Sequence, residues 1–283
     1  MPRRSNKDKL IFTVGGINVS IRTIHPALKK RLERYYKAFL SRQKPDINIS
    51  TTIKDFPVPD KERFSLSASS WQLSRDNGLF RLYFPQGKRH SLAEFSSSLK
   101  QVKLYCADNS AGPLLYLLPS MLVGLKLIKN DGLILHACAV FDSRKAYLFI
   151  APSGGGKSTI AGLALKEGLK VLNYDRIILR RQKRSFKIYA NPWHGEVKSV
   201  SNRSYAIREI FFLEKSASHK ITPVSKTEAL VELCKNSIYL PLNYAIIKKR
   251  FRICCDFAQN LKCYRLGFKP DKSLWRFLNA AIK

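Results

Sequence analysis

Acidic residues are scarce in this chain of 283 residues, which carries 20 Asp and Glu against 51 Lys and Arg, a formal net charge of +31. A field of this sign attracts polyanions, which include nucleotides, nucleic acid, acidic proteins and anionic lipids, and it does not choose among them. No recognition motif for nucleic acid accompanies the charge, which disfavours nucleic acid as a partner without excluding it. The same charge also suits a solvated basic surface that has no specific partner.

Long apolar segments are missing as well. The most hydrophobic run, Leu114 to Ile128, contains Pro119 and Lys126 and is shorter than the ~20 residues that a membrane span requires. No apolar signal core follows the polar N-terminus. None of the six cysteines forms a CxxC pair, and the histidines complete no zinc pattern. These absences predict a reduced, cytoplasmic protein with no membrane span and no structural metal.

The composition still allows a substantial core, because 45% of the residues are hydrophobic and 11% are aromatic. The length suits one large domain or two ordinary ones. Residues 1–105 predict a small α+β unit rich in antiparallel strands. Its signals are β-rich runs on either side of Gly15-Gly16, helical spacing over His25–Leu40 and a turn at Asn77-Gly78. Short strands are expected over residues 46–53, 64–66, 71–74 and 79–84.

From residue 106 to residue 283 the pattern is typical of an α/β domain. Leu133–Phe141 and Ala146–Ile150 are near-continuous apolar runs, as expected of strands that are buried on both faces. A turn is expected between them, at residues 142–145. The other expected elements are strands over 171–179, 185–189, 210–213 and 263–268, and helices over 113–128, 159–167, 227–240, 243–260 and 273–282.

One segment after the second of these strands carries a chemical signature. Residues 151–158 fit the phosphate-loop pattern G-x-x-x-x-G-K-[ST] at every fixed position except the first, where Ala151 replaces glycine. Glycines let backbone N–H groups converge on phosphate oxygens, and the positive end of the following helix adds to the attraction. Lys157 can reach the β- and γ-phosphates, and the Ser158 hydroxyl can bind Mg²⁺. The alternative is a glycine-rich surface turn that happens to precede Lys-Ser.

We therefore predict a site for ATP and Mg²⁺. The residues expected to bind the nucleotide are Ser153, Gly154, Gly155, Gly156, Lys157, Ser158 and Thr159.

Four ordered segments resemble the motifs of HPr kinase/phosphorylase-related proteins, and most closely a stand-alone branch with an N-terminal α+β unit. The segments are Leu135–Ala137, Ala151–Thr159, Asn173–Arg176 and Asn191–Glu196. The resemblance covers most of the chain and is specific over residues 132–197. It implies a P-loop kinase core, related to phosphoenolpyruvate carboxykinase, that moves the γ-phosphoryl group of ATP to a serine hydroxyl.

The resemblance also implies roles for single residues. His136 matches a histidine on the strand before the loop, and Asp175 matches the second Asp of a pair, which would help to hold Mg²⁺. The first Asp of that pair, usually the candidate base, is Tyr174 here. A phenol with a reference pKa of ~10 is a poor base at neutral pH. Three interpretations follow: His136 or Glu196 is the base, transfer is slow, or the protein binds nucleotide without transferring phosphate.

The predicted catalytic residues are thus His136, Lys157, Asp175 and Glu196, and the predicted metal ligands are Ser158 and Asp175. Each has a structural alternative, since His136 can be a core histidine and Asp175 a turn residue, and Glu196 is favoured only by its loop position. The leading function is a kinase acting on a serine or similar hydroxyl of a protein, peptide or small molecule.

Two other functions remain open. One is a nucleotide-binding regulatory or scaffold protein, and the other is an NTPase associated with nucleic acid. The basic run Arg180–Arg184 is either a solvated hairpin tip or a docking patch for an acidic protein or peptide. Self-association is possible and is not decided by the sequence.

Overall fold

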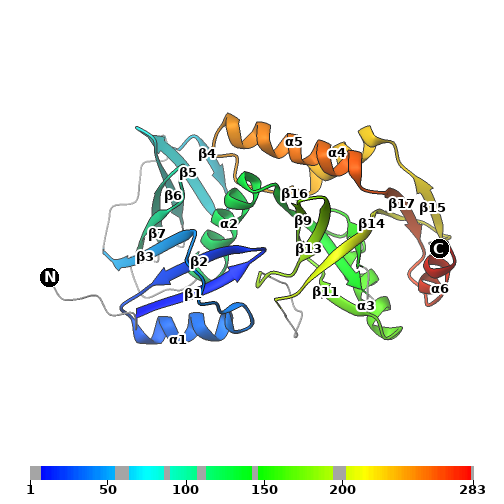
Figure 1. Ribbon diagram of the computed structural model, residues 1–283, viewed down its shortest axis with the longest axis horizontal. Helices are drawn as coiled ribbons and strands as arrows, with labels where there is room; N and C mark the ends of the chain where they lie inside the picture. Colours follow the sequence, from blue (N-terminus) through cyan, green and yellow to red (C-terminus); the bar gives the residue numbers. More distant parts are fainter. Residues whose placement is uncertain are drawn as a thin grey trace. The chain divides into compact units, whose positions relative to one another are not determined.

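The computed structural model describes residues 8–54, 64–85, 90–106, 113–141, 146–193 and 202–281. The chain splits into two compact units, Met1–Val123 and Gly124–Lys283. Each unit contains helices and a large β-sheet, so the α/β class is confirmed at that level (Figure 1). Helix α2 (Leu118–Lys129) crosses the division between the units. The domain boundary predicted after residue 105 stays a prediction.

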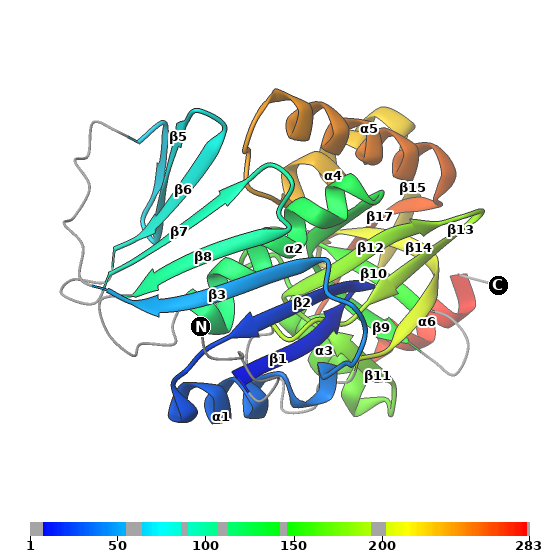
Figure 2. The same ribbon diagram turned by 60° about the vertical axis from the view of Figure 1, so that its left-hand side comes forward.

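The first unit is built on an eight-stranded sheet whose order is β1-β2-β3-β8-β7-β6-β5-β4 (Figure 2). β1 (Lys9–Val14) and β2 (Ile17–Arg22) form the predicted hairpin. Gly15 and Gly16 have φ values of 57° and 76°, which a two-residue type I′ turn requires. The helix expected over residues 25–40 is shorter, with α1 at Pro26–Tyr35 and a 3₁₀ turn at Lys37–Phe39.

This sheet is less purely antiparallel than expected. β3 (Ile47–Ile53) pairs in parallel with both β2 and β8 (Gln101–Cys106). β7 (Ser91–Ser96) and β8 were not predicted; the buried positions of β7 are Ser91, Ala93 and Phe95, which give little hydrophobic alternation. The remaining strands of the sheet are β4 (Leu66–Ala68), β5 (Trp71–Asp76) and β6 (Leu79–Phe84).

In the second unit, β9, β10, β14, β13 and β12 pair in a closed ring, in which each strand pairs with the next and β12 pairs with β9. β9 (Gly132–Phe141) pairs with β10 (Ala146–Ile150) and β12 (Arg176–Gln182). β14 (Ser204–Lys215) pairs with β10 and β13 (Ser185–Tyr189), and β13 pairs with β12. The other elements are β11 (Lys170–Asn173), β15 (Lys220–Pro223), β16 (Ser237–Ile238), β17 (Cys263–Phe268), α3 (Lys157–Lys166), α4 (Lys226–Asn236), α5 (Tyr244–Asn260) and α6 (Ser273–Ala281).

Three strands of this unit run in the same direction. β14 is parallel to β10, with Phe212 opposite Ile150, and β17 is parallel to β14, with Phe268 opposite Lys215. The segments that leave these strands therefore start from one edge of the sheet. In open parallel sheets, this carboxyl edge is where ligands bind.

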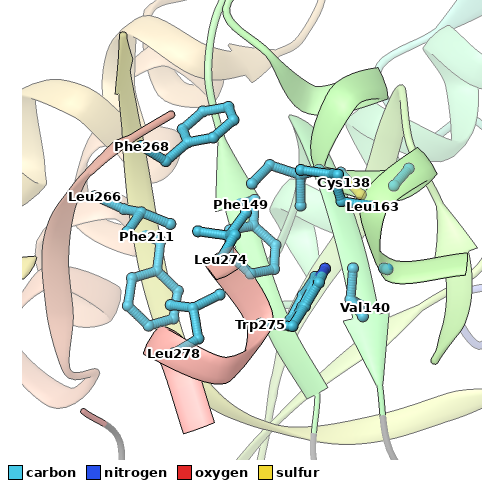
Figure 3. Packing of buried hydrophobic residues seen from close by; sticks show 13 residues of the cluster. Cys138, Val140, Phe149, Leu163, Phe211, Leu266, Phe268, Leu274, Trp275 and Leu278 are labelled. Carbon is cyan, nitrogen blue, oxygen red and sulfur yellow. The ribbon is translucent and has the colours of Figure 1, made fainter. Parts of the chain in front are cut away.

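A buried cluster fixes these strands against two helices. Phe149 of β10 stacks on Phe211 of β14 at 5.3 Å between ring centroids and meets Trp275 of α6 edge-on at 5.8 Å. Figure 3 shows Leu274 and Leu278 of α6 beside these rings, with Leu163 of α3 on the other side. The core thus holds the carboxyl edge of β10, β14 and β17 in place.

Several predicted elements have different ends in the structure. The strand expected over residues 171–179 is broken at Tyr174 and Asp175 into β11 and β12. The helix expected over 227–240 ends at Asn236, and β16 follows it. The expected turn at residues 142–145 lies outside the described residues. β15 was not predicted.

Candidate functional site

A cavity of about 690 Å³ lies at the carboxyl edge of β10, β14 and β17. Its lining includes residues predicted from three separate segments of the sequence: the strand before the glycine-rich loop, the loop itself and the Tyr174–Asp175 break. Their functional roles stay predictions. The lining residues are His136, Ser153, Gly154, Gly156, Lys157, Ser158, Thr159, Tyr174, Asp175, Lys215, Ser216, Phe268 and Pro270.

The glycine-rich loop (residues 151–158) needs two of its glycines for backbone reasons. Gly154 has φ 75°, and Gly156, the N-cap of α3, has φ 94°; L-residues with a side chain rarely adopt such values. A Cβ on Gly156 would also stand 2.8 Å from the ring of Phe268. The loop is therefore curled at these positions and touches the end of β17.

The third glycine, Gly155, lies against Ala151, the residue that departs from the motif. A Cβ on Gly155 would lie 2.5 Å from the Cβ of Ala151, so alanine at position 151 leaves room only for glycine at 155. The Gly155 N–H donates to the Pro152 carbonyl at 3.1 Å, and Gly155 does not line the cavity. The predicted role of Gly155 in binding a phosphate stays a prediction.

Lys157 is buried inside the loop. Its ammonium donates to the carbonyl oxygens of Ala151 and Pro152, each at 2.8 Å. Burial lowers the pKa of Lys157, and the nearby charge of Asp175 opposes that shift. An ammonium has three donors, so one donor remains beyond these two carbonyls.

His136 lies on β9, and Asp175 lies just before β12, the strand that pairs with β9 beside it. Arg176 is directly opposite His136 in the β12–β9 ladder, and the Ala137 N–H donates to the Asp175 carbonyl at 3.3 Å. The buried Asn173 accepts from the Asp175 N–H at 3.1 Å, which fixes the break between β11 and β12. Burial lowers the pKa of His136 below 6.5, against the opposing charge of Asp175, so the imidazole is neutral at pH 7.

The lining residues fit a magnesium ion better than a closed metal site. Ser158 and Asp175 offer a hydroxyl and a carboxylate, and Mg²⁺ commonly takes one or two carboxylates, several waters and substrate phosphates. Within the described part of the chain, no three His, Cys, Asp or Glu residues gather as a ligand group. A nucleotide would have to supply the remaining ligands.

The segment that carries Glu196 begins beside the site. Asn191 donates through Nδ2 to the Arg176 carbonyl at 2.6 Å, and its Oδ1 accepts from the Trp193 N–H at 2.9 Å. Trp193 is fully buried. Glu196 itself lies outside the described residues, so its predicted role stays a prediction.

Four lining residues were not singled out from the sequence: Lys215, Ser216, Phe268 and Pro270. They lie at or just beyond the carboxyl ends of β14 and β17. Only the parallel pairing of these strands with each other and with β10 brings them to the glycine-rich loop. These four residues could therefore be found only from the long-range pairing of the strands, and no local motif indicates them.

No helix within the described ranges is long and apolar enough to cross a membrane.

A family model described as "SynChlorMet cassette protein ScmC" matches residues 117–283. No curated protein matches the chain. Among solved structures, the chain is similar to the Hpr(Ser) kinase/phosphatase from Coxiella burnetii, with 10% sequence identity and a TM-score of 0.31 over 53% of this chain and 97% of that one. A likeness at that TM-score does not establish a shared fold.

Proposed function

Because the ScmC family model covers more than half of the chain, the protein belongs to that family, and we propose that it is an ATP-dependent kinase with a P-loop core. The description of the family states no reaction, so the proposal is based on the site. The observation that carries it is one cavity that unites the glycine-rich loop and Lys157 with Asp175 and His136.

The loop supplies the groups that a triphosphate needs. Its curled backbone and the N-terminus of α3 present N–H groups and a partial positive charge to an anion. Lys157, already anchored to two loop carbonyls, has its remaining donor for a phosphate oxygen. Anchoring reduces the freedom that the side chain loses on binding, which favours affinity.

Ser158 and Asp175 would hold Mg²⁺ together with the phosphates. When bound, this ion neutralises charge that develops on the transferred group. Asp175 is suited to that position because the Asn173 side chain fixes its backbone. Its carboxylate lies 3.4 Å from the Arg176 guanidinium.

His136 is proposed as the base. The acceptor hydroxyl would attack the γ-phosphorus, forming an O–P bond while the bond between that phosphorus and the β–γ bridging oxygen breaks. ADP leaves, and the hydroxyl proton passes to the imidazole. A neutral imidazole can accept that proton, and the lowered pKa of His136 keeps it neutral. Glu196 is the alternative base.

The rival function is nucleotide binding without transfer, and Tyr174 favours it. Tyr174 lines the cavity where the resemblance places the usual base, and it packs against the buried cluster of Figure 3. A tyrosine that serves mainly as packing would leave a binding site with slow chemistry or none. Phosphoryl transfer depends mostly on positioning and charge neutralisation, which supports activity even with Tyr174 in this place.

The experiment is a transfer assay on the full chain. The protein is incubated with Mg²⁺ and ATP labelled at the γ-phosphate, with water and serine-containing peptides as acceptors. Label should appear on phosphate or peptide, and Asp175→Asn should abolish that signal while the chain stays folded. ATP binding without any turnover, in the wild type and in Tyr174→Asp alike, would establish the rival function.

The acceptor is proposed to be acidic around its hydroxyl, and the β12–β13 hairpin supports this. A shallow hollow of about 570 Å³ at the hairpin is lined by five cations and no carboxylate. The Arg181 side chain is held by Asp256 and lies over the Phe186 ring. The five cations are Arg180, Arg181, Lys183, Arg184 and Lys187.

Its test is binding of a fluorescent polyglutamate peptide. The double change Lys183→Glu and Arg184→Glu should weaken peptide binding and leave ATP affinity unchanged, because the hairpin tip lies at the opposite end of β12 from Asp175. Random DNA serves as the comparison. Tighter, steeply salt-dependent binding of DNA would instead support the nucleic-acid function.

A further inference from the structure

The cavity has a second cation, Lys215, at the last position of β14. Its neighbours on the same face of the strand are Phe211 and Leu213, which belong to or pack against the buried cluster, because side chains alternate along a strand. Lys215 is thus a charged residue that continues an apolar, inward-facing row. Glu214 points to the opposite face.

The position of Lys215 relative to the glycine-rich loop follows from β17. Lys215 is directly opposite Phe268 in the parallel β14–β17 ladder, and the Ser216 N–H donates to the Phe268 carbonyl at 3.3 Å. The Phe268 ring in turn stands so close to Gly156 that a Cβ there would be 2.8 Å away. Lys215 is therefore one strand away from a ring that touches the loop.

The charge of Lys215 is available to a ligand in the cavity. No ion pair or hydrogen bond of its ammonium occurs among the described residues, and the side chain is exposed towards the cavity. Asp271, which follows the lining residue Pro270, is engaged by Lys269 at 3.5 Å and by His219 at 3.3 Å. Hydrogen bonds from Ser273 lower the pKa of Asp271 to about 2.

The wall that carries Lys215 is also braced. His219, just before β15, lies 2.7 Å from the Ser273 hydroxyl at the start of α6, and its Nδ1 accepts from the Lys269 N–H at 3.4 Å. These contacts join the segment after β14 to the segment after β17. Both segments contribute to the cavity lining, so their mutual position is fixed.

We propose that Lys215, at the end of β14, binds the terminal phosphate of a nucleotide held in the loop by Lys157. This inference rests on the proposed function, because it requires a nucleotide in the loop. Lys157 and Lys215 are the two lysines of the lining, and Asp175 is its carboxylate. An ammonium is a compact charge with rotatable donors, which suits a phosphate oxygen that extends beyond the loop. Lys215 thereby distinguishes a triphosphate from a diphosphate.

The test compares the affinities of ATP–Mg²⁺ and ADP–Mg²⁺ by calorimetry on the full chain. Lys215→Met keeps the length of the side chain and removes its charge, and it should weaken ATP binding by ~10-fold or more, since a hydrogen bond to a charged group is lost. ADP affinity should stay within about twofold. Lys215→Arg should retain most of the ATP affinity, because it keeps the cation.

Lys220→Met is the matched control. Lys220 is an exposed lysine at the start of β15, directly opposite Gly267 in the β15–β17 ladder, and it does not line the cavity. The inference is overturned if Lys215→Met and Lys220→Met bind ATP equally well, or if Lys215→Met weakens ATP and ADP to the same extent. A wild-type chain that binds neither nucleotide would overturn the proposed function itself, so the two failures are distinguishable.

Discussion

Ala151 and Gly155 are in contact across the glycine-rich loop, and a Cβ added to Gly155 would stand 2.5 Å from the Cβ of Ala151. The two positions are therefore coupled: the alanine at the start of the loop is tolerated because residue 155 has no side chain. The Pro152 carbonyl, 3.1 Å from the same point, adds a second and more rigid obstacle. This coupling gives the loop a specific mutational signature.

Gly155→Ala should weaken ATP binding, because the loop must open to relieve the contact with Ala151. Adding Ala151→Gly should restore part of the affinity, and the Pro152 carbonyl should keep the rescue incomplete. Calorimetric affinities for the two single variants and the double variant form a cycle. Strictly additive effects in that cycle would show that the two residues are not coupled.

Gly162→Ala is the corresponding control within the helix that follows the loop. Gly162 lies inside α3, and nothing stands within 4 Å of the Cβ that alanine would add. Alanine should stabilise the chain by about 0.5–1 kcal/mol, because glycine loses more backbone entropy in a helix. The measurement is denaturant unfolding, with ATP affinity unchanged. A loss of stability would mean that α3 is packed differently at this position.

The pH dependence of transfer should follow His136. The pKa of His136 is lowered by burial, and only the neutral form accepts a proton, so the rate should be highest at neutral pH and above and should fall as the pH drops through the lowered pKa. His136→Gln should lower the rate by ~10²–10⁴-fold and abolish the fall of the rate at low pH. An unchanged profile in His136→Gln, together with inactivity of Glu196→Gln, would transfer the role to Glu196.

Tyr174→Asp tests whether the chemistry lacks a carboxylate. If it does, the variant should transfer phosphate faster than the wild type, by up to the ~10²–10⁴-fold that a general base contributes. Tyr174→Phe is the control, because it keeps the ring that packs against the buried cluster and removes only the hydroxyl. If His136 already serves as the base, Tyr174→Asp should leave the rate unchanged or lower it through lost packing.

Local patterns were sufficient for the elements on which the glycine-rich loop depends. β10 and β17 have the predicted ends; β10 is a compact apolar run, whereas β17 also contains Arg265 and Gly267. α3 begins at Lys157, two residues before its predicted start, because the helix starts within the motif itself. The Asn77-Gly78 turn has φ values of 45° and 80°, as its residue types predict.

Long-range pairing determined what the sequence did not show. The break at Tyr174 and Asp175 divides residues 171–179, which the sequence predicts as one strand, and it is fixed by the Asn173 side chain. Lys215 and Phe268 lie 53 positions apart in the chain and are neighbours only because β14 and β17 are parallel. No motif marks either residue, so the second wall of the cavity could not be predicted.

The central claim is that a nucleoside triphosphate binds in the glycine-rich loop, and calorimetric titration of ATP–Mg²⁺ tests it most directly. The wild type should bind, and Lys157→Met should weaken binding by ~10-fold or more, because the cation next to the phosphates is lost. Thermal unfolding of both chains shows whether the variant stays folded without the hydrogen bonds from Lys157 to the carbonyls of Ala151 and Pro152. Equal affinity of the two folded chains, or no binding by the wild type, would contradict the claim.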